Sequence, residues 1–206
     1  MTEGHKSLPQ LHIGCFDRAV AGWINTDITP HLWVAKVPLL AAVLRRSGLM
    51  GKERFEQHRR GTFVPVRYMN ATRRFPYPDN SIQAIFSSHF LEHLFHDEAR
   101  FCLSEVHRVL RPGGVCRIVV PDLDKIVTDY DSESPERFLR MMFEYPERKS
   151  AKNLHHWMYN ESYLSRICLE IGFGEVFRRE YRQGLCPDLD QLDNRPDESL
   201  YLEAIK

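Results

Sequence analysis

The chain has 206 residues, and its 28 Lys and Arg residues balance 28 Asp and Glu residues. The zero formal charge gives no indication of a nucleic-acid partner, because such partners are attracted by a strongly basic field. No run of sequence approaches the roughly 18 consecutive apolar residues that a membrane-spanning helix needs. The length suits one domain, which we expect to cover residues 1–206.

The five cysteines stand at positions 15, 102, 116, 168 and 186, and no two of them form a Cys-x-x-Cys pair. Their odd number and their scatter argue against a disulfide framework and against a zinc site built from cysteines. Residues 1–6 contain no apolar signal stretch. We therefore expect a cytoplasmic protein in a reducing environment.

Predicted strands and helices alternate over the first 120 residues. Short apolar segments bounded by Gly, Pro, Asn or Asp predict strands over 11–14, 22–28, 63–68, 82–87 and 115–120. Residues 33–50 carry a helical apolar face, with Pro38 suited to its first turn, and residues 97–110 give the clearest helix. Pro65 favours a sheet edge for its strand. The alternation favours a mainly parallel sheet.

The second half of the chain predicts helices first and then two strands. Residues 122–145 predict one or two helices broken over 131–135, and residues 161–171 predict a helix that Gly172 ends. Residues 175–181 and 200–205 predict two last strands, for which an antiparallel pair is one arrangement. Residues 52–61, by contrast, are basic and polar without a clear period, so no element is predicted there.

The first two predicted strands are joined by a connection too short for a helix. Gly14 ends the first strand and Asp27 lies near the end of the second, and the eight residues 15–22 span roughly 26 Å at about 3.3 Å each. A glycine there lets a ligand approach the backbone, and an acid at the next strand end can accept both hydroxyls of a ribose. An ordinary turn glycine and a surface aspartate are the alternative.

Five segments in this order resemble class I S-adenosylmethionine-dependent methyltransferases: 11–15, 22–28, 75–80, 87–94 and 109–115. The resemblance is strong over 75–122 and 155–173, and it is closest to a small bacterial branch (methyltransferase type 11-like) with a shortened first crossover. It implies an α/β fold, a Rossmann-like three-layer sandwich with a mainly parallel seven-stranded sheet and an antiparallel C-terminal strand. It also implies S-adenosyl-L-methionine as the cofactor.

The resemblance assigns roles to eight residues of the cofactor site. They are Gly14 and Cys15 at the methionine part, Asp27 at the ribose, Ile28 beside the adenine, Asn70 and Ala71 at the adenine amine, and Ser87 and Ser88 below the sulfonium. The carbonyl of Asn70 would accept the bond from the amine. Phe16 stands where the family commonly has a third small residue.

Histidines are the candidates for proton transfer and acceptor binding. Methyl transfer needs alignment of donor and acceptor and sometimes a base, a role that suits histidine because its pKa lies near neutrality. His89, which follows the strand 82–87, is the first candidate base, and His93 is the second. His155, His156 and Tyr159 precede a helix and could line the acceptor pocket, with capping and packing as the alternative.

The segment 89–93 also matches the His-x-x-Glu-His pattern of inverted zinc metallopeptidases. That function needs a helix over 89–93, whereas the predicted helix begins near residue 97. No third protein ligand can be identified downstream, so the sequence predicts no metal site. Alternatively, Glu92 and His93 cap the next helix while Leu91 and Leu94 fill the core.

Residues 31–62 are expected to form a helical insertion or lid that recognises a phosphate-bearing or lipid-linked acceptor. The segment combines an apolar helix with Lys52, Arg54, Arg59 and Arg60, and a solvated basic face is the alternative. Weak contact of this helix with a membrane surface is a further option.

Taken together, the residues and the resemblance predict an S-adenosylmethionine-dependent methyltransferase. Its acceptor is expected to be a small molecule or glycan, with transfer to an oxygen of a sugar, glycolipid precursor or related metabolite. A non-catalytic cofactor-binding or interaction module is the second hypothesis, which Phe16 and Asn70 favour. A zinc hydrolase that uses His89, Glu92 and His93 is the third.

Overall fold

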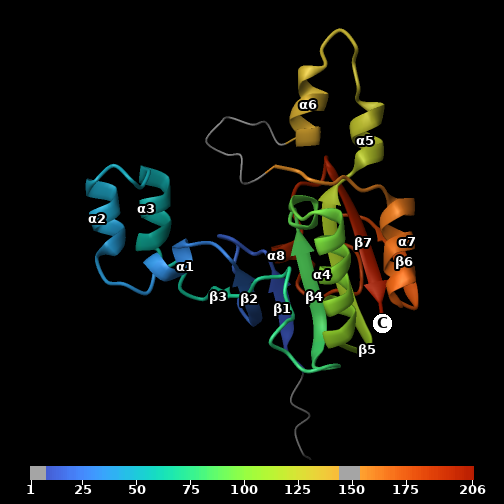
Figure 1. Cartoon of the computed structure of the whole chain (residues 1–206), viewed down its shortest axis with the longest axis horizontal. Coiled ribbons are helices and arrows are strands. Elements are labelled where there is room, and N and C mark those ends of the chain that lie inside the picture. The colour runs from blue at the N-terminus through green and yellow to red at the C-terminus, as the bar shows by residue number, and fades with distance from the viewer. Residues whose placement is uncertain (1–7, 144–153) are drawn as a thin grey trace, which may run out of the picture.

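The computed structural model describes residues 8–143 and 154–206, and a seven-stranded sheet lies at its centre (Figure 1). The strands follow the spatial order β3-β2-β1-β4-β5-β7-β6. Their bounds are Gln10–Ile13 (β1), Trp23–Asp27 (β2), Arg67–Tyr68 (β3), Ile82–Ser88 (β4), Leu110–Pro121 (β5), Glu175–Arg179 (β6) and Ser199–Ile205 (β7). Strands β1 to β5 pair in parallel, and β7 runs antiparallel to both of its neighbours. This arrangement confirms the predicted fold class.

Two long helices cover one face of the sheet. Helix α4 (His96–Val109) buries an apolar stripe, and α7 (Glu161–Ile171) packs beside it over β6 and β7. The side chain of Asn160 caps α7 by accepting a hydrogen bond from the backbone N–H of Tyr163 at 3.0 Å. Gly172 ends α7 in the left-handed conformation with a φ of 118°, as predicted.

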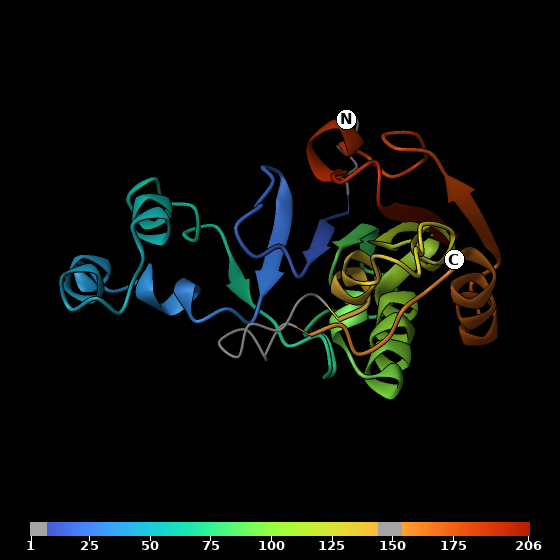
Figure 2. The ribbon, with the colours of Figure 1, turned by 90° about the horizontal axis from the view of Figure 1, so that it is seen from above.

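The opposite face is covered by irregular chain rather than by long helices. Residues 180–198, which include the short helix α8 (Leu189–Leu192), lie on the far side of the sheet from α4 (Figure 2). Leu189 and Leu192 pack there with Trp23, Phe86 and Tyr201. No helix follows β1, as the short connection predicted. Residues 180–198 therefore form the third layer of the sandwich.

Residues 31–62 form a separate helical lobe beyond the β3 edge of the sheet (Figures 1 and 2). The helix predicted over 33–50 is two helices, α1 (His31–Val34) and α2 (Leu40–Arg46), and a third, α3 (Lys52–Arg59), lies where none was predicted. The strand predicted over 63–68 was too long, since only Arg67 and Tyr68 pair with β2, at the sheet edge that Pro65 predicted.

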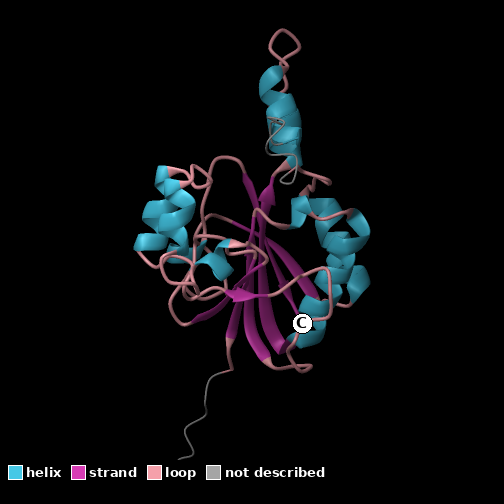
Figure 3. Ribbon diagram, turned by 60° about the vertical axis from the view of Figure 1, so that its left-hand side comes forward, coloured by secondary structure: helices cyan, strands magenta, loops and turns pink. Residues whose placement is uncertain are grey.

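Three further helical segments follow the ends of β4 and β5. A 3₁₀ turn, η1 (Leu91–His93), comes directly after β4. Helices α5 (Leu123–Thr128) and α6 (Glu136–Phe143) stand above the carboxyl end of the sheet (Figure 3), with the predicted break between them. Residues 144 and 145 of the predicted range lie outside the described residues. In the described part of the chain, no helix is long and apolar enough to cross a membrane.

Candidate functional site

The ends of β1 and β2 form a small corner pocket of about 50 Å³. Gly14 and Asp27 line it at the two strand ends, and residues 69–72, which follow β3, form its floor. Phe90 and Leu94, from the chain after β4, complete the lining. In a parallel sheet the carboxyl ends of the strands near the reversal of strand order are where ligands bind. The corner pocket lies at that place.

Asp27 is held in this corner by two backbone amides. Its Oδ2 accepts a hydrogen bond from the N–H of Phe16 at 3.0 Å, and its Oδ1 accepts one from the N–H of Thr29 at 2.6 Å. Burial raises the pKa of the Asp27 carboxyl above its usual value. Each oxygen of an ionised carboxylate has a second acceptor position. Asp27 is therefore oriented to accept two further hydrogen bonds, such as those of a ribose diol.

Gly14 separates the corner pocket from a second, larger pocket of about 280 Å³. Its φ is +67°, and a Cβ atom at this position would lie 2.5 Å from the ring of Phe90. A larger residue is therefore excluded both by conformation and by space. Cys15 beside it is buried, and burial raises the pKa of its thiol to about 12. The thiol packs as a neutral group.

Phe16 adopts a left-handed backbone conformation with a φ of +45°, which is unusual for a bulky residue. Its ring turns toward the helical lobe, where it meets the ring of Phe63 at 6.0 Å and the guanidinium of Arg54 at 4.6 Å. The ring lines the edge of the second pocket but not the corner pocket. Phe16 thus leaves the pocket around Asp27 open.

Asn70 and Ala71 lie in the corner pocket, together with Ile28. Oδ1 of Asn70 accepts hydrogen bonds from both the N–H and the hydroxyl of Thr72, each at 2.9 Å. Both acceptor positions of this oxygen are therefore in use. In this conformation no acceptor position of Oδ1 is left for the hydrogen bond expected from an adenine amine. Ala71 is buried, whereas the Ile28 side chain is 59% exposed at the pocket rim.

His89 lines the second pocket with both of its ring nitrogens engaged. Nε2 lies 2.9 Å from the hydroxyl of Ser199, while Nδ1 lies 3.3 Å from a guanidinium nitrogen of Arg195 and 3.4 Å from Oε1 of Glu92. The backbone at His89 has a positive φ of 47°. A proton from an acceptor can reach this ring only after one of these contacts is released.

The second pocket contains residues that sequence reasoning missed. The hydroxyl of Ser88 accepts a hydrogen bond from the side-chain amide of Asn194 at 3.0 Å, and His12 and Arg195 also line the pocket. Ser87 is buried in β4. Asn194 and Arg195 lie more than a hundred positions along the chain from Ser88, outside any motif, and only the sheet topology brings them there.

Glu92 lies at the centre of a second cluster of predicted site residues. His93 and His155 each place a nitrogen close to its carboxylate, so that the three ligand atoms lie within 4.8 Å of one another. Tyr159 is buried nearby, and burial, together with the charge of Glu92, raises the pKa of its hydroxyl. His156 is separated from this cluster, since its ring stacks on Phe95 with centroids 4.2 Å apart.

The segment 89–93 does not form the helix that an inverted metallopeptidase site requires. Residues 91–93 form a 3₁₀ turn, and α4 begins only at His96. His89 and His93 are therefore not presented one α-helical turn apart, and they contact different partners: Ser199 and Arg195 for the first, the carbonyl of Leu154 for the second. The proposed capping role of Glu92 and His93 is also not seen, because Glu98 caps α4.

Comparison with known proteins adds two independent findings to this geometry. Residues 42–118 match the model of a family described as a methyltransferase domain. An 87-residue stretch, 41% of this chain, is 39% identical to a protein of Mycolicibacterium smegmatis named "Probable S-adenosylmethionine-dependent methyltransferase". That stretch covers 33% of the relative. These two matches, to a methyltransferase domain and to a protein named as an S-adenosylmethionine-dependent methyltransferase, each span less than half of this chain.

Solved structures share the fold of this chain at low sequence identity. A protein of Pyrococcus horikoshii has a TM-score of 0.55 at 12% identity, over 98% of this chain and 84% of that one. A methyltransferase of Archaeoglobus fulgidus, described as SAM-dependent, has a TM-score of 0.50 at 14% identity, over 98% of this chain and 87% of that one. They support the fold class alone.

S-adenosylmethionine is the cofactor that these matches imply, and the corner pocket has features that suit it. Asp27 offers two oriented acceptor oxygens at the end of β2, and Gly14, after β1, lines both pockets. These are the features that a ribose and an adjoining amino-acid chain require. The residues present therefore fit the group.

Proposed function

We propose that this chain transfers the methyl group of S-adenosylmethionine to an oxygen of a sugar, glycolipid precursor or related small metabolite. Asp27 carries the proposal, because two backbone amides orient its carboxylate in a pocket at the strand ends. The adenosyl part is assigned to the corner pocket, and the amino-acid part passes Gly14 into the second pocket. Arg195 in that pocket supplies a cation for the carboxylate of the cofactor.

The reaction proposed for the second pocket is a direct displacement at carbon. The acceptor oxygen forms a bond to the methyl carbon while the carbon–sulfur bond breaks, and the electron pair of that bond remains on sulfur. The acceptor proton passes to a base, for which His89 is the proposed group because it lines this pocket at the end of β4. The main contribution of the protein is alignment of donor and acceptor.

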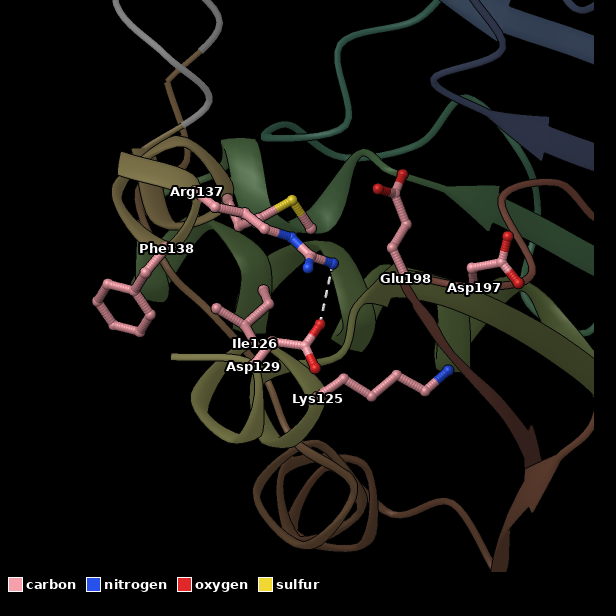
Figure 4. Close-up of a pocket in the computed structure, with 8 residues that line it drawn as sticks. Lys125, Ile126, Asp129, Arg137, Phe138, Asp197 and Glu198 are labelled. Carbon is pink, nitrogen blue, oxygen red and sulfur yellow. Dashed lines mark hydrogen bonds and ion pairs between the residues drawn. The ribbon is translucent and has the colours of Figure 1, made fainter. Parts of the chain in front are cut away.

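A third pocket, of about 220 Å³, supports a polar acceptor (Figure 4). Lys125, Asp129 and Arg137 line it together with Asp197 and Glu198, and Arg137 and Asp129 point toward each other at 3.0 Å. Ile126, Phe138 and Met141 add apolar surface. Alternating charged and apolar groups suit a hydroxyl-rich molecule that presents both polar edges and apolar ring faces. The pocket lies above the sheet, between α5 and α6.

Calorimetric titration with S-adenosylmethionine tests the cofactor site. We expect one site per chain, and we expect Asp27→Asn to weaken binding by about ten- to a hundredfold, because charge-assisted hydrogen bonds contribute about 1.5–3 kcal/mol. Asp79→Asn is the matched control, since Asp79 pairs with Arg108 before the start of β4 and lines neither pocket. Equal affinity of the wild-type protein and Asp27→Asn would contradict the assignment.

Turnover is tested by the release of S-adenosylhomocysteine in the presence of sugars, nucleotide sugars and lipid-linked oligosaccharides. We expect release with at least one hydroxyl acceptor, and we expect His89→Ala to lower kcat while cofactor affinity is retained. Binding of the cofactor without release from any acceptor would favour the non-catalytic module instead.

A further inference from the structure

We propose that Glu92, His93 and His155 form a binding site for a divalent transition metal ion, for which the donor set favours zinc. One carboxylate oxygen and one nitrogen of each imidazole lie within 4.8 Å of one another. Two histidines and one carboxylate are a common set of zinc ligands. Ligand atoms about 2.1 Å from a tetrahedral ion lie about 3.4 Å apart. Side-chain rotations that move the three ligand atoms by roughly 1 Å would bring them to this separation.

The environment of Glu92 provides an independent observation. Its side chain is completely buried, and neither carboxylate oxygen accepts a hydrogen bond from any described residue. Oε1 of Glu92 lies 3.4 Å from Nδ1 of His89, and the His89 ring is a cation only when it is protonated. A buried carboxylate without donors is costly, by several kcal/mol. A bound dication would supply the missing compensation.

The two histidines are held as metal ligands usually are. Nδ1 of His93 lies 3.2 Å from the backbone carbonyl of Leu154, and Nδ1 of His155 lies 2.9 Å from that of Met141. Metal-ligating histidines typically place one ring nitrogen against a backbone carbonyl in this way and bind the metal through the other. The surrounding backbone thus orients both rings beside Glu92.

The backbone also joins the two parts of the site. The carbonyl oxygen of Glu92 accepts hydrogen bonds from the N–H groups of His156 and Trp157, at 2.7 and 3.2 Å. The turn 91–93 and the segment 155–157 are therefore fixed to each other, although more than sixty positions separate them. Three protein ligands leave one position for water or an acceptor oxygen. A role in methyl transfer would rest on the proposed function, whereas metal binding does not.

The experiment measures zinc bound to the full chain in the absence of cofactor and acceptor. After treatment with a chelator and equilibration with Zn²⁺, elemental analysis is expected to find one zinc per chain. Glu92→Gln and His155→Gln are expected to lower the affinity for Zn²⁺ at least tenfold, whereas His156→Gln, one position away, keeps it. Substitution with Co²⁺ should give the absorption of nitrogen and oxygen ligation, without a thiolate charge-transfer band.

Two results would overturn the site. One is wild-type protein that binds no zinc, and the other is a folded Glu92→Gln variant that binds zinc as tightly as the wild type. His155→Gln, at a half-buried position, provides the same test if the Glu92 variant does not fold. Because no methyl donor is present, loss of the methyltransferase function and loss of the metal site give distinguishable outcomes.

Discussion

The sequence alone does not show where the side chain of Phe16 points. A bulky residue in place of a small one suggested a blocked cofactor corner, but the ring packs against Phe63 and Arg54 instead. Its strained backbone costs about 1–3 kcal/mol. That strain lets the N–H of Phe16 bond with Asp27. No periodic pattern in the sequence predicts this strained conformation or the hydrogen bond to Asp27 that it allows.

Asp27 gives the cofactor site a pH dependence with a definite sign. Burial raises the pKa of its carboxyl above 3.8, so the proton returns at a higher pH than it would in the unfolded chain. This group therefore favours the folded state below its unfolded pKa, and it loses that contribution as the pH rises through the folded value. The ionised form, which the proposed site needs to accept the ribose hydroxyls, is the form present above that value.

We expect the affinity for S-adenosylmethionine to fall as the pH drops through the raised pKa of Asp27. Calorimetric titrations between neutral pH and pH 4 measure this, with adenosine as a second ligand that lacks the titrating amino-acid part. Asp27→Asn should bind weakly and with a flat pH profile. A wild-type affinity that stays constant over this range would show that the carboxylate does not hold the ribose.

At the scale of elements, the sequence predicted those with clear periodicity and missed those without it. The helix predicted over 97–110 is α4, shifted by one residue, because its apolar stripe is regular. Helix α3 was missed because Lys52–Arg59 is polar on most sides and buries no residue completely. The observed strand β3 is shorter than the strand predicted over 63–68, because Pro65 lacks the N–H that pairing needs. Phe63 and Val66 are instead buried in the turn that precedes β3.

The candidate site was predictable to the extent that it follows strand ends. Gly14, Asp27 and Ser88 end strands, and the structure brings them to the two adjoining pockets. Asn194 and Arg195 reach the same place from a segment with no regular pattern, so no local signal could identify them. The proximity of Glu92 to His155 is equally non-local, and no pattern in the sequence predicted it.

The helical lobe is docked on the loop after β1 by Arg54. Its guanidinium lies over the rings of Phe16 and Phe63, at 4.6 and 5.6 Å, and it pairs with Asp17 at 3.4 Å. The lobe stands beyond β3 (Figure 2), and these contacts join it to the loop after β1. A role of the lobe as a lid stays a prediction.

We expect Arg54→Ala to loosen this docking. A cation–π contact at a partly exposed site contributes about 0.5–1 kcal/mol, so amide exchange over residues 15–18 should become about two- to fivefold faster. Hydrogen–deuterium exchange with mass spectrometry measures it. Arg59→Ala is the control on the same helix, because Arg59 pairs with Glu56 within α3 at 3.1 Å. Equal exchange in the two variants would assign the docking to other residues.

At the scale of the whole molecule, the buried side chain of Arg117 binds residues 180–195 to the sheet. Arg117 in β5 is fully buried, with its guanidinium 2.5 Å from Asp193 and 3.7 Å from Glu203. It also donates hydrogen bonds to the carbonyls of Glu180 and Gln183, both at 2.9 Å. These contacts hold residues 180–195 in the place that a crossover helix would otherwise occupy.

Arg117→Met should lower the free energy of unfolding by about 3–5 kcal/mol, because it leaves the buried carboxylate of Asp193 without its cation. Urea denaturation followed by circular dichroism measures the loss. Arg100→Met is the matched control: its pair with Glu170 is exposed, and such pairs contribute only about 0.2–1 kcal/mol. Similar losses in both variants would mean that the buried network is not the main anchor of the segment.

The position of β7 has a consequence for how the chain acquires its fold. This strand is the last in sequence, yet it lies between β5 and β6 and bonds to both. During synthesis on a ribosome, β6 therefore has no partner until residues 199–205 have emerged, and the nascent chain exposes unpaired strand edges until that moment.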